Sequence, residues 1–265
     1  MTYRCALITG ASSGIGEAFA RALPRTTSLL LTGRDRTRLA HLAAELANAD
    51  RTVRSIAADL ATAEGRQAVI GFAEGQPVDL LINNAGTACL GPVADNPPER
   101  EAEMAQLNMA APVEITRALL PGMLKRTAID AGIDAGGGRR GGLVFVASAA
   151  AFMPVPLFAT YAASKAFLLH YAEALAAELS DTPVDVLALC PGATRTRFFE
   201  RANIGRANLP QMHEPDRVAR EGLQALGHRV VHVVGPGNYL ATAAARFLPR
   251  RLIAAAAERA MRRWQ

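Results

Sequence analysis

The sequence predicts an α/β protein built on a doubly wound parallel sheet of about seven strands, with helices on both faces. Short apolar runs alternate along the chain with segments of helical periodicity. The runs are continuously apolar, as expected for strands that are covered on both sides. Half of the 265 residues are apolar, enough for one substantial core.

The first strand is predicted where the N-terminal apolar run begins, and the others follow in order. The predicted strands are Cys5–Thr9, Ser28–Thr32, Thr52–Ala57, Val78–Ile82, Leu143–Ala147, Val184–Leu189 and Arg229–Val234. The predicted helices are 14–23, 35–47, 62–73, 97–125, 159–180 and 215–227, with one or two more within 239–264. Glycine-rich Thr127–Gly142 is predicted to be a surface loop. We therefore expect a single catalytic domain, 1–238, and a helical extension, 239–265.

A glycine-rich turn, Thr9–Gly16, joins the first predicted strand to the first helix. Glycines allow a tight turn and a close approach of phosphate to the backbone, and a helix N-terminus favours an anion. The spacing differs from the commonest dinucleotide fingerprint, and such a turn on its own can be only a turn. Hydrogen-bonding or small residues also end later strands, at Arg34, Asp59-Leu60, Asn83–Gly86 and Pro191–Thr196. Together they predict a nucleotide site at the carboxyl edge of the sheet.

An acid/base pair is predicted where Tyr161 and Lys165 stand four residues apart on a helix, because a helix places such residues on one face. A nearby ammonium favours the phenolate, so we expect Lys165 to lower the pKa of Tyr161. Ser148 ends the fifth predicted strand and should point into the same crevice. By itself, this spacing is also typical of a solvated helix face.

The order of these motifs resembles that of the short-chain dehydrogenases/reductases, which are Rossmann-like NAD(P)-dependent oxidoreductases, over about residues 4–235. The resemblance implies that Tyr161 is the catalytic acid/base, that Lys165 holds the nicotinamide ribose, and that Ser148 binds the substrate oxygen. It also implies that Asn108 supports a water-linked proton relay. The cofactor-binding residues that it implies are Gly10, Ser12, Ser13, Gly14, Ile15, Gly16, Arg34, Asp59, Leu60, Asn83, Asn84, Ala85, Gly86, Tyr161, Lys165, Pro191, Gly192, Thr194 and Thr196.

Arg34, which follows Gly33, implies NADP(H) as the preferred cofactor and NAD(H) as the alternative. An arginine here can accept a 2′-phosphate, whereas an acid would bind the free ribose hydroxyl. Asp35, an acid, slightly weakens the preference for NADP(H). Ser13 leaves the turn without the extra basic residue of some NADP-binding members.

The substrate is expected to be a mostly apolar carbonyl compound or secondary alcohol. The residues predicted to line its pocket are mostly apolar: Thr87, Cys89, Ala149, Ala150, Phe152, Met153, Val155, Phe158, Ala193, Phe198 and Phe199. The same side chains can equally build core. Residues 197–214 are expected to form a lid over the site.

The extension, 239–265, carries the whole net charge of +5, with six arginines against Glu258. One helical face is mainly apolar and comprises Leu252, Ile253, Ala256, Ala257, Ala260, Met261 and Trp264. The helix can therefore pack on its own domain, on a partner, or peripherally on an anionic membrane. The rest of the chain has no basic stripe interleaved with aromatics, so we expect no nucleic-acid partner.

The cysteines Cys5, Cys89 and Cys190 are widely spaced, which favours free thiols in a reducing compartment. The histidines show no metal-ligand spacing, so no metal site is predicted. The N-terminus leads directly into a strand, so we expect no signal peptide and a cytoplasmic protein. A homo-oligomer is also expected.

The sequence thus predicts an NADP(H)-dependent carbonyl reductase or secondary-alcohol dehydrogenase acting on a small molecule. A second hypothesis is an epimerase or dehydratase that uses the cofactor transiently. A third is a non-catalytic nucleotide-sensing protein, against which the complete Ser148, Tyr161 and Lys165 set argues.

Overall fold

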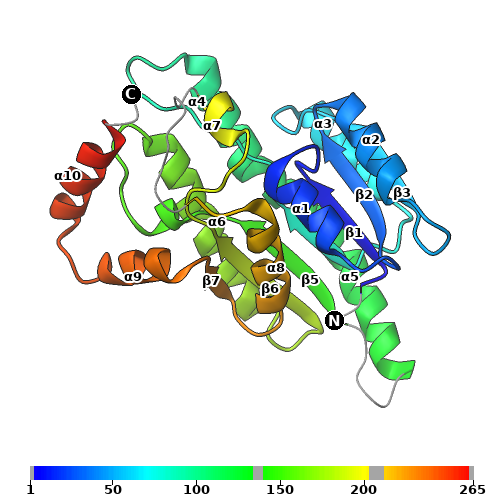
Figure 1. Ribbon diagram of the computed structural model, residues 1–265. Helices are drawn as coiled ribbons and strands as arrows, with labels where there is room; N and C mark the ends of the chain where they lie inside the picture. The colour runs from blue at the N-terminus through cyan, green and yellow to red at the C-terminus, as the bar shows by residue number, and fades with distance from the viewer. Residues whose placement is uncertain (1–2, 134–139, 203–211, 263–265) are drawn as a thin grey trace.

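A central parallel sheet organises the computed structural model, which describes residues 3–133, 140–202 and 212–262. The sheet contains seven strands in the order β3-β2-β1-β4-β5-β6-β7, and all neighbouring strands pair in parallel (Figure 1). The strands are β1 Cys5–Thr9, β2 Ser28–Gly33, β3 Val53–Ala57, β4 Leu80–Asn83, β5 Gly141–Val146, β6 Val184–Cys190 and β7 Val231–Val233. The predicted three-layer fold is confirmed.

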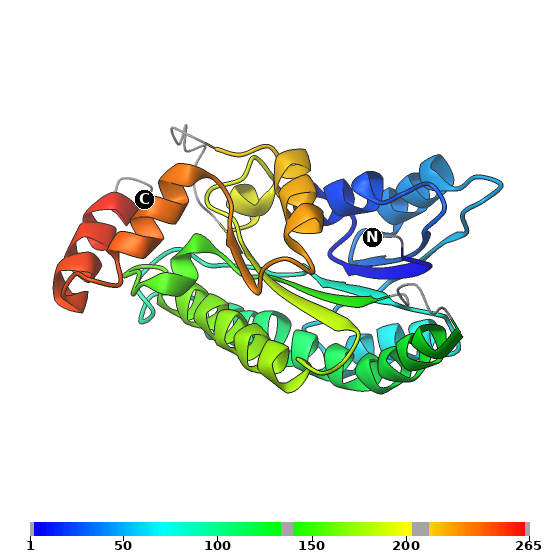
Figure 2. The same ribbon diagram turned by 90° about the horizontal axis from the view of Figure 1, so that it is seen from below.

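Helices cover both faces of the sheet (Figure 2). One face carries α1 Gly14–Ala22, α2 Arg36–Leu46 and α8 Pro215–Ala225, and the other carries α3 Ala63–Ala73, α5 Ala111–Ile133 and α6 Ala159–Glu178. The remaining helices are α4 Pro98–Ala105, α7 Phe198–Arg201, α9 Pro236–Ala244 and α10 Arg250–Met261. Figure 1 shows α9 and α10 beyond β7, at the side of the molecule far from β3.

Alternate strand residues enter different cores, which explains why the strands read as continuous apolar runs. In β5, Leu143 and Phe145 join the core under α3, α5 and α6. Val144 and Val146 join the core under α1, α2 and α8. Each face therefore supplies apolar side chains to its own helical layer.

The strand order reverses between β1 and β4, which are neighbours although two strands separate them in the sequence. Connections leave in opposite directions from such a point, so a crevice opens at the carboxyl ends of the two strands. The turn after β1 and the Asn83–Gly86 segment after β4 therefore meet there.

Three predicted elements differ most from the structure. The single helix predicted over 97–125 is α4, then a π-helical turn, Gln106–Ala110, then α5. The predicted loop Thr127–Gly142 is shorter, because α5 continues to Ile133 and β5 begins at Gly141; residues 134–139 lie outside the described part. The last strand spans only Val231–Val233. In the described chain, no helix is both long and apolar enough to cross a membrane.

Candidate active site

A cavity of about 570 Å³ opens at the carboxyl edge of the sheet, where the reversal in strand order predicts a binding crevice. Segments that follow β1, β2, β3, β4, β5 and β6 line it together with the first turns of α6. The predicted cofactor-binding residues that line it are Gly10, Ser12, Ser13, Gly14, Ile15, Arg34, Asp59, Leu60, Asn84, Ala85, Gly86, Tyr161, Lys165, Pro191, Gly192, Thr194 and Thr196. Gly16 and Asn83 do not line this cavity.

The turn after β1 leaves the N-terminus of α1 open toward the cavity. Ser13 is the residue before the helix, and its side chain makes no capping hydrogen bond. Gly14 has φ of 62°, a conformation that side chains disfavour, and an added methyl would lie 2.8 Å from Thr196 Cγ2. An uncapped helix end whose first residues line a cavity is suited to phosphate.

Gly16 stands where the start of α1 packs closely against the turn after β1 and the segment after β4. A methyl there would collide with the carbonyl oxygen of Gly10 and the amide of Asn84. Only glycine lets α1 approach the turn this closely. The absence of a side chain at Gly16 therefore allows the turn to keep its shape.

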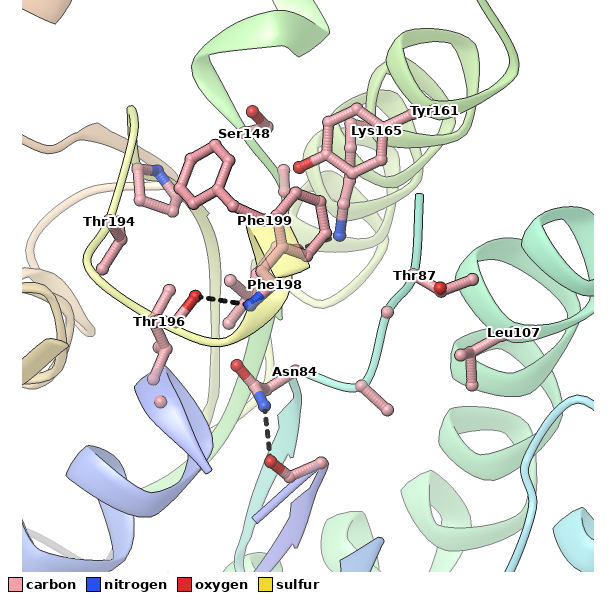
Figure 3. A pocket seen from close by; sticks show the side chains of 18 of the residues that line it. Asn84, Thr87, Leu107, Ser148, Tyr161, Lys165, Thr194, Thr196, Phe198 and Phe199 are labelled. Atoms are coloured by element: carbon pink, nitrogen blue, oxygen red, sulfur yellow. Dashed lines mark hydrogen bonds between the residues drawn. The ribbon is translucent and has the colours of Figure 1, made fainter. Parts of the chain in front are cut away.

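The two neighbouring asparagines after β4 have different roles. Asn84 donates from Nδ2 to the carbonyl oxygen of Thr9 at 2.8 Å, which ties the end of β4 to the end of β1. Figure 3 shows Asn84 at the opposite end of the view from Ser148 and Tyr161. Asn83 is buried and donates to Thr116 Oγ1 at 3.1 Å, in α5. The side chain of Asn83 thus lies on the α5 side of the strand, and its predicted contact with the cofactor stays a prediction.

Ser148, Tyr161 and Lys165 meet at one end of the cavity, as predicted (Figure 3). Ser148 ends the segment after β5 and accepts from the amide of Ala150 at 3.1 Å. Tyr161 and Lys165 lie in the first turns of α6 and are buried. Lys165 Nζ donates to the carbonyl oxygen of Val146 at 2.8 Å and lies 5.7 Å from the centroid of the Tyr161 ring.

Burial affects the pKa values of Tyr161 and Lys165 more than the interaction between the two side chains does. Burial raises the pKa of Tyr161 to about 12, although a hydrogen bond with Ser148 lowers it. Burial likewise lowers the pKa of Lys165 to about 8. The net shift of the Tyr161 pKa is therefore upward instead of downward as predicted, because desolvation outweighs the contributions that lower it. At neutral pH the phenol is therefore a proton donor beside a charged ammonium.

Asn108 lies behind the cavity instead of in its wall. It is buried in the π-helical turn, where Oδ1 accepts from the amide of Thr87 at 3.0 Å. Its Nδ2 donates to the Thr87 carbonyl at 2.9 Å and to Ser164 Oγ at 3.0 Å. A methyl on Gly86 would lie 3.3 Å from Asn108 Oδ1 and 3.4 Å from Lys165 Nζ, so the missing side chain leaves room beside both. π-helical turns often mark functional sites.

Arg34 lies at the far end of the cavity and is half-exposed. Its guanidinium pairs with Glu103 of α4 at 2.9 Å. Asp35 caps α2 by accepting from the amide of Arg38 at 3.0 Å. The carboxylate of Asp35 is therefore already engaged, while Arg34 can exchange an exposed ion pair for a phosphate.

The end of the cavity near Tyr161 is apolar. The predicted substrate residues that line it are Thr87, Ala149, Ala150, Val155, Phe158, Ala193, Phe198 and Phe199. Cys89, Phe152 and Met153 do not line it, although Cys89 packs against the same apolar cluster. Within the predicted lid, α7 supplies Phe198 and Phe199, and residues 203–211 lie outside the described part.

Sequence reasoning missed several lining residues, above all Asn238 and Met261. Asn238 lies in the first turn of α9 and contacts His213 Nε2 through Nδ2 at 3.0 Å. Met261 ends α10 and is buried. The apolar pattern of the extension was visible in the sequence, but no pattern showed which surface it would cover.

A nicotinamide dinucleotide fits this set of residues. The open N-terminus of α1 suits its phosphates, and the guanidinium-bearing Arg34 lines the same cavity. The hydroxyls of Ser148 and Tyr161 stand at the apolar end, where a carbonyl oxygen could accept from both. Among the described residues no three metal-ligating side chains gather.

Comparison with known proteins gives consistent results. The sequence pattern of the short chain dehydrogenase family matches residues 4–207. A short chain dehydrogenase of Pseudocercospora fijiensis is 33% identical over 74% of this chain, and the match spans 61% of that protein, less than two-thirds of its length.

Solved structures extend the likeness over nearly the whole chain. A short-chain dehydrogenase from Sphingobium yanoikuyae in complex with NADPH is 31% identical, with a TM-score of 0.78 over 92% of this chain and 93% of that one. A bulky-bulky ketone specific alcohol dehydrogenase from Comamonas testosteroni is 27% identical, with a TM-score of 0.73 over 93% of each chain. With the sheet order and the cavity described above, these matches identify the chain as a member of the short chain dehydrogenase family.

Proposed function

We propose that the protein is an NADP(H)-dependent carbonyl reductase, or secondary-alcohol dehydrogenase in the reverse direction, acting on mostly apolar substrates. One observation carries the proposal. A phenol kept neutral by burial, a serine hydroxyl and a lysine ammonium lie together at the apolar end of a cavity that begins at an open helix N-terminus. That arrangement suits proton transfer to a carbonyl oxygen beside a bound dinucleotide.

In reduction, the hydroxyls of Ser148 and Tyr161 donate to the carbonyl oxygen and polarise it. The nicotinamide supplies the hydride when it is bound. Tyr161 gives its proton to the oxygen as negative charge develops there. The ammonium of Lys165 stabilises the phenolate that remains, because opposite charges attract strongly where water is excluded. In the oxidative direction the phenolate accepts the proton of the alcohol.

The preference for NADP(H) rests on Arg34 and Asp35. An acid that reads the free 2′-hydroxyl must be available to it, and Asp35 is engaged as the cap of α2. Arg34 offers a guanidinium that forms charge-assisted hydrogen bonds with phosphate. The Sphingobium relative in complex with NADPH supports the same choice.

The proposed substrates are ketones with apolar groups on both sides. The charged lining residues Arg34, Asp35 and Asp59 belong to the loops after β2 and β3. Lys165 is buried and bonded to Val146. No other described charge lines the cavity to hold a substrate carboxylate. The Comamonas neighbour, specific for bulky-bulky ketones, agrees with this class. Assembly into a homo-oligomer and membrane contact through the extension stay predictions.

NADPH consumption across a panel of aldehydes, ketones and quinones tests the function. Stoichiometric consumption with conversion of an apolar ketone to its alcohol supports it. An epimerase or dehydratase would change its substrate without net loss of NADPH. A nucleotide sensor would bind NADPH tightly and reduce nothing, which would contradict the proposal.

A further inference from the structure

The C-terminal helix α10 contributes a side chain to the cavity that holds Tyr161. Met261 lies one hundred positions after Tyr161 in the sequence, yet both line the same cavity. Met261 is only 5% exposed and belongs to a buried apolar cluster with Phe158 and Tyr161. The extension therefore forms part of the wall of the candidate active site.

The path of the chain explains how Met261 reaches the site. After β7, α9 runs beside the short helical turn Ala149–Phe152, which follows Ser148. The Arg246 guanidinium, just past α9, lies 5.8 Å from the centroid of the Phe152 ring. The chain then turns at Pro249, which precedes α10. The extension is thus anchored to the segment that carries Ser148.

One face of α10 holds the helix in place. Ile253 and Met261, eight positions apart, are its buried residues, at 9% and 5% exposure. Leu252 is 62% exposed, although the sequence places it on the apolar face. Burial of Ile253 and Met261 is the main apolar attachment of this helix, and one of these two side chains reaches the cavity.

The surroundings of Met261 are apolar. Val155, Phe158, Phe198 and Phe199 line the same cavity and pack with the Met261 cluster. A methionine side chain has three rotatable bonds and a polarisable sulfur, so it adapts to ligands of different shape. A group that extends from a carbonyl bound at Tyr161 toward this cluster meets Met261.

We propose that Met261 is a specificity-determining residue that limits the size of the apolar group a ketone can carry on the side of the α10 helix. The inference rests on the proposed function, because it deepens the substrate class of the same site. It requires that the space beside Tyr161 end at the Met261 side chain. A smaller residue then admits a larger group, and a larger residue excludes it.

Selectivity between a large and a small ketone tests this inference. The ratio of kcat/KM for benzophenone to that for cyclohexanone is measured with NADPH. Met261→Ala should raise this ratio and Met261→Trp should lower it, each by about tenfold or more, because pocket shape discriminates apolar groups on that scale. Met261→Leu, of similar volume, should leave the ratio near that of the wild type.

Leu252→Ala is the matched control, because it shortens an exposed side chain on the same helix. It should leave the ratio unchanged. Unchanged NADPH affinity and a cooperative thermal transition show that each Met261 variant is folded. Ratios for folded Met261→Ala and Met261→Trp that equal that of the wild type overturn the inference.

A binding measurement separates this inference from the proposed reaction. The rise in unfolding temperature that benzophenone produces in the presence of NADP⁺ is recorded for each variant. If the wild type reduces no ketone but this rise changes with the residue at 261, the proposed reaction fails and the inference stands. The inference is overturned if benzophenone raises the unfolding temperature by the same amount in every variant, or raises it in none.

Discussion

NADPH affinity should fall as the pH rises through about 8, because Lys165 then loses its charge. Burial holds the pKa of this ammonium at about 8, below its ordinary value. A lowered lysine pKa means that the charged form is present below that pH and lost above it. Tyr161 and Cys190, the titratable groups beside it, both have pKa values raised to about 12 and stay neutral in this range.

The pKa sets the size of the effect. With a pKa of about 8, Lys165 is about nine-tenths charged at pH 7 and about one-tenth charged at pH 9. If the cofactor binds to the charged form, the apparent Kd for NADPH rises about tenfold over that interval, equal to about 1.4 kcal/mol. Calorimetric titration at pH 7, 8 and 9 measures it.

The chain offers a matched control, because Lys125 and Lys165 are its only lysines. Lys125 is exposed on α5, so Lys125→Met should retain the pH dependence. Lys165→Met should weaken binding at pH 7 and abolish the dependence. A Kd that stays flat from pH 7 to 9 in the wild type, or an equal rise in Lys165→Met, would refute the reasoning.

Three further predictions concern the proton donor, cofactor choice and the extension. Tyr161→Phe should reduce turnover by about a hundredfold or more while NADPH still binds, since only a hydroxyl is removed; rates near wild type would exclude Tyr161 as the donor. Arg34→Ala should weaken NADPH about tenfold or more but NADH little, because only NADPH presents a 2′-phosphate; equal losses would contradict that role. Truncation after Asn238 should lower the unfolding temperature, because burying Ile253 and Met261 contributes about 1.5–3 kcal/mol each. Pelleting of the full-length chain with anionic vesicles, and an unchanged melt on truncation, would instead favour a membrane anchor.

The fold could be predicted because periodicity and burial act locally. A strand covered on both faces is mainly apolar, so β1 and the inner parts of β5 and β6 are visible as apolar runs. Parallel strands bring their carboxyl ends to one edge, which placed Ser148 and the Thr9–Gly16 turn together. Helical spacing then placed Tyr161 and Lys165 side by side.

The sequence predicts less where the result depends on tertiary packing. Of two adjacent asparagines, Asn83 faces α5 and Asn84 faces the cavity, and this depends on strand register. The prediction for Tyr161 and Lys165 considered only the attraction between the ammonium and the phenolate. It left out the burial of both groups and the hydrogen bond from Lys165 to the Val146 carbonyl, so it gave the wrong direction for the Tyr161 pKa.

The placement of Met261 shows the same limit at longer range. The sequence left open whether the apolar face of the extension packs on its own domain, a partner or a membrane, and the residues that Met261 contacts lie about one hundred positions earlier. Only the folded chain brings α10 to Phe158 and Tyr161. A sequence pattern gives the buried face of a helix better than it gives the partner of that face.

Deuterium transfer is the most direct test of the central claim, that this cavity moves hydride between a nicotinamide and a carbonyl carbon. An apolar ketone is reduced with NADPH deuterated at C4, and the alcohol is analysed by mass spectrometry and NMR. The predicted result is deuterium on the carbinol carbon from one face of the nicotinamide, and about a hundredfold less labelled alcohol in the same time with Tyr161→Phe. An alcohol without deuterium from either C4-labelled form, or labelled product undiminished in Tyr161→Phe, would contradict it.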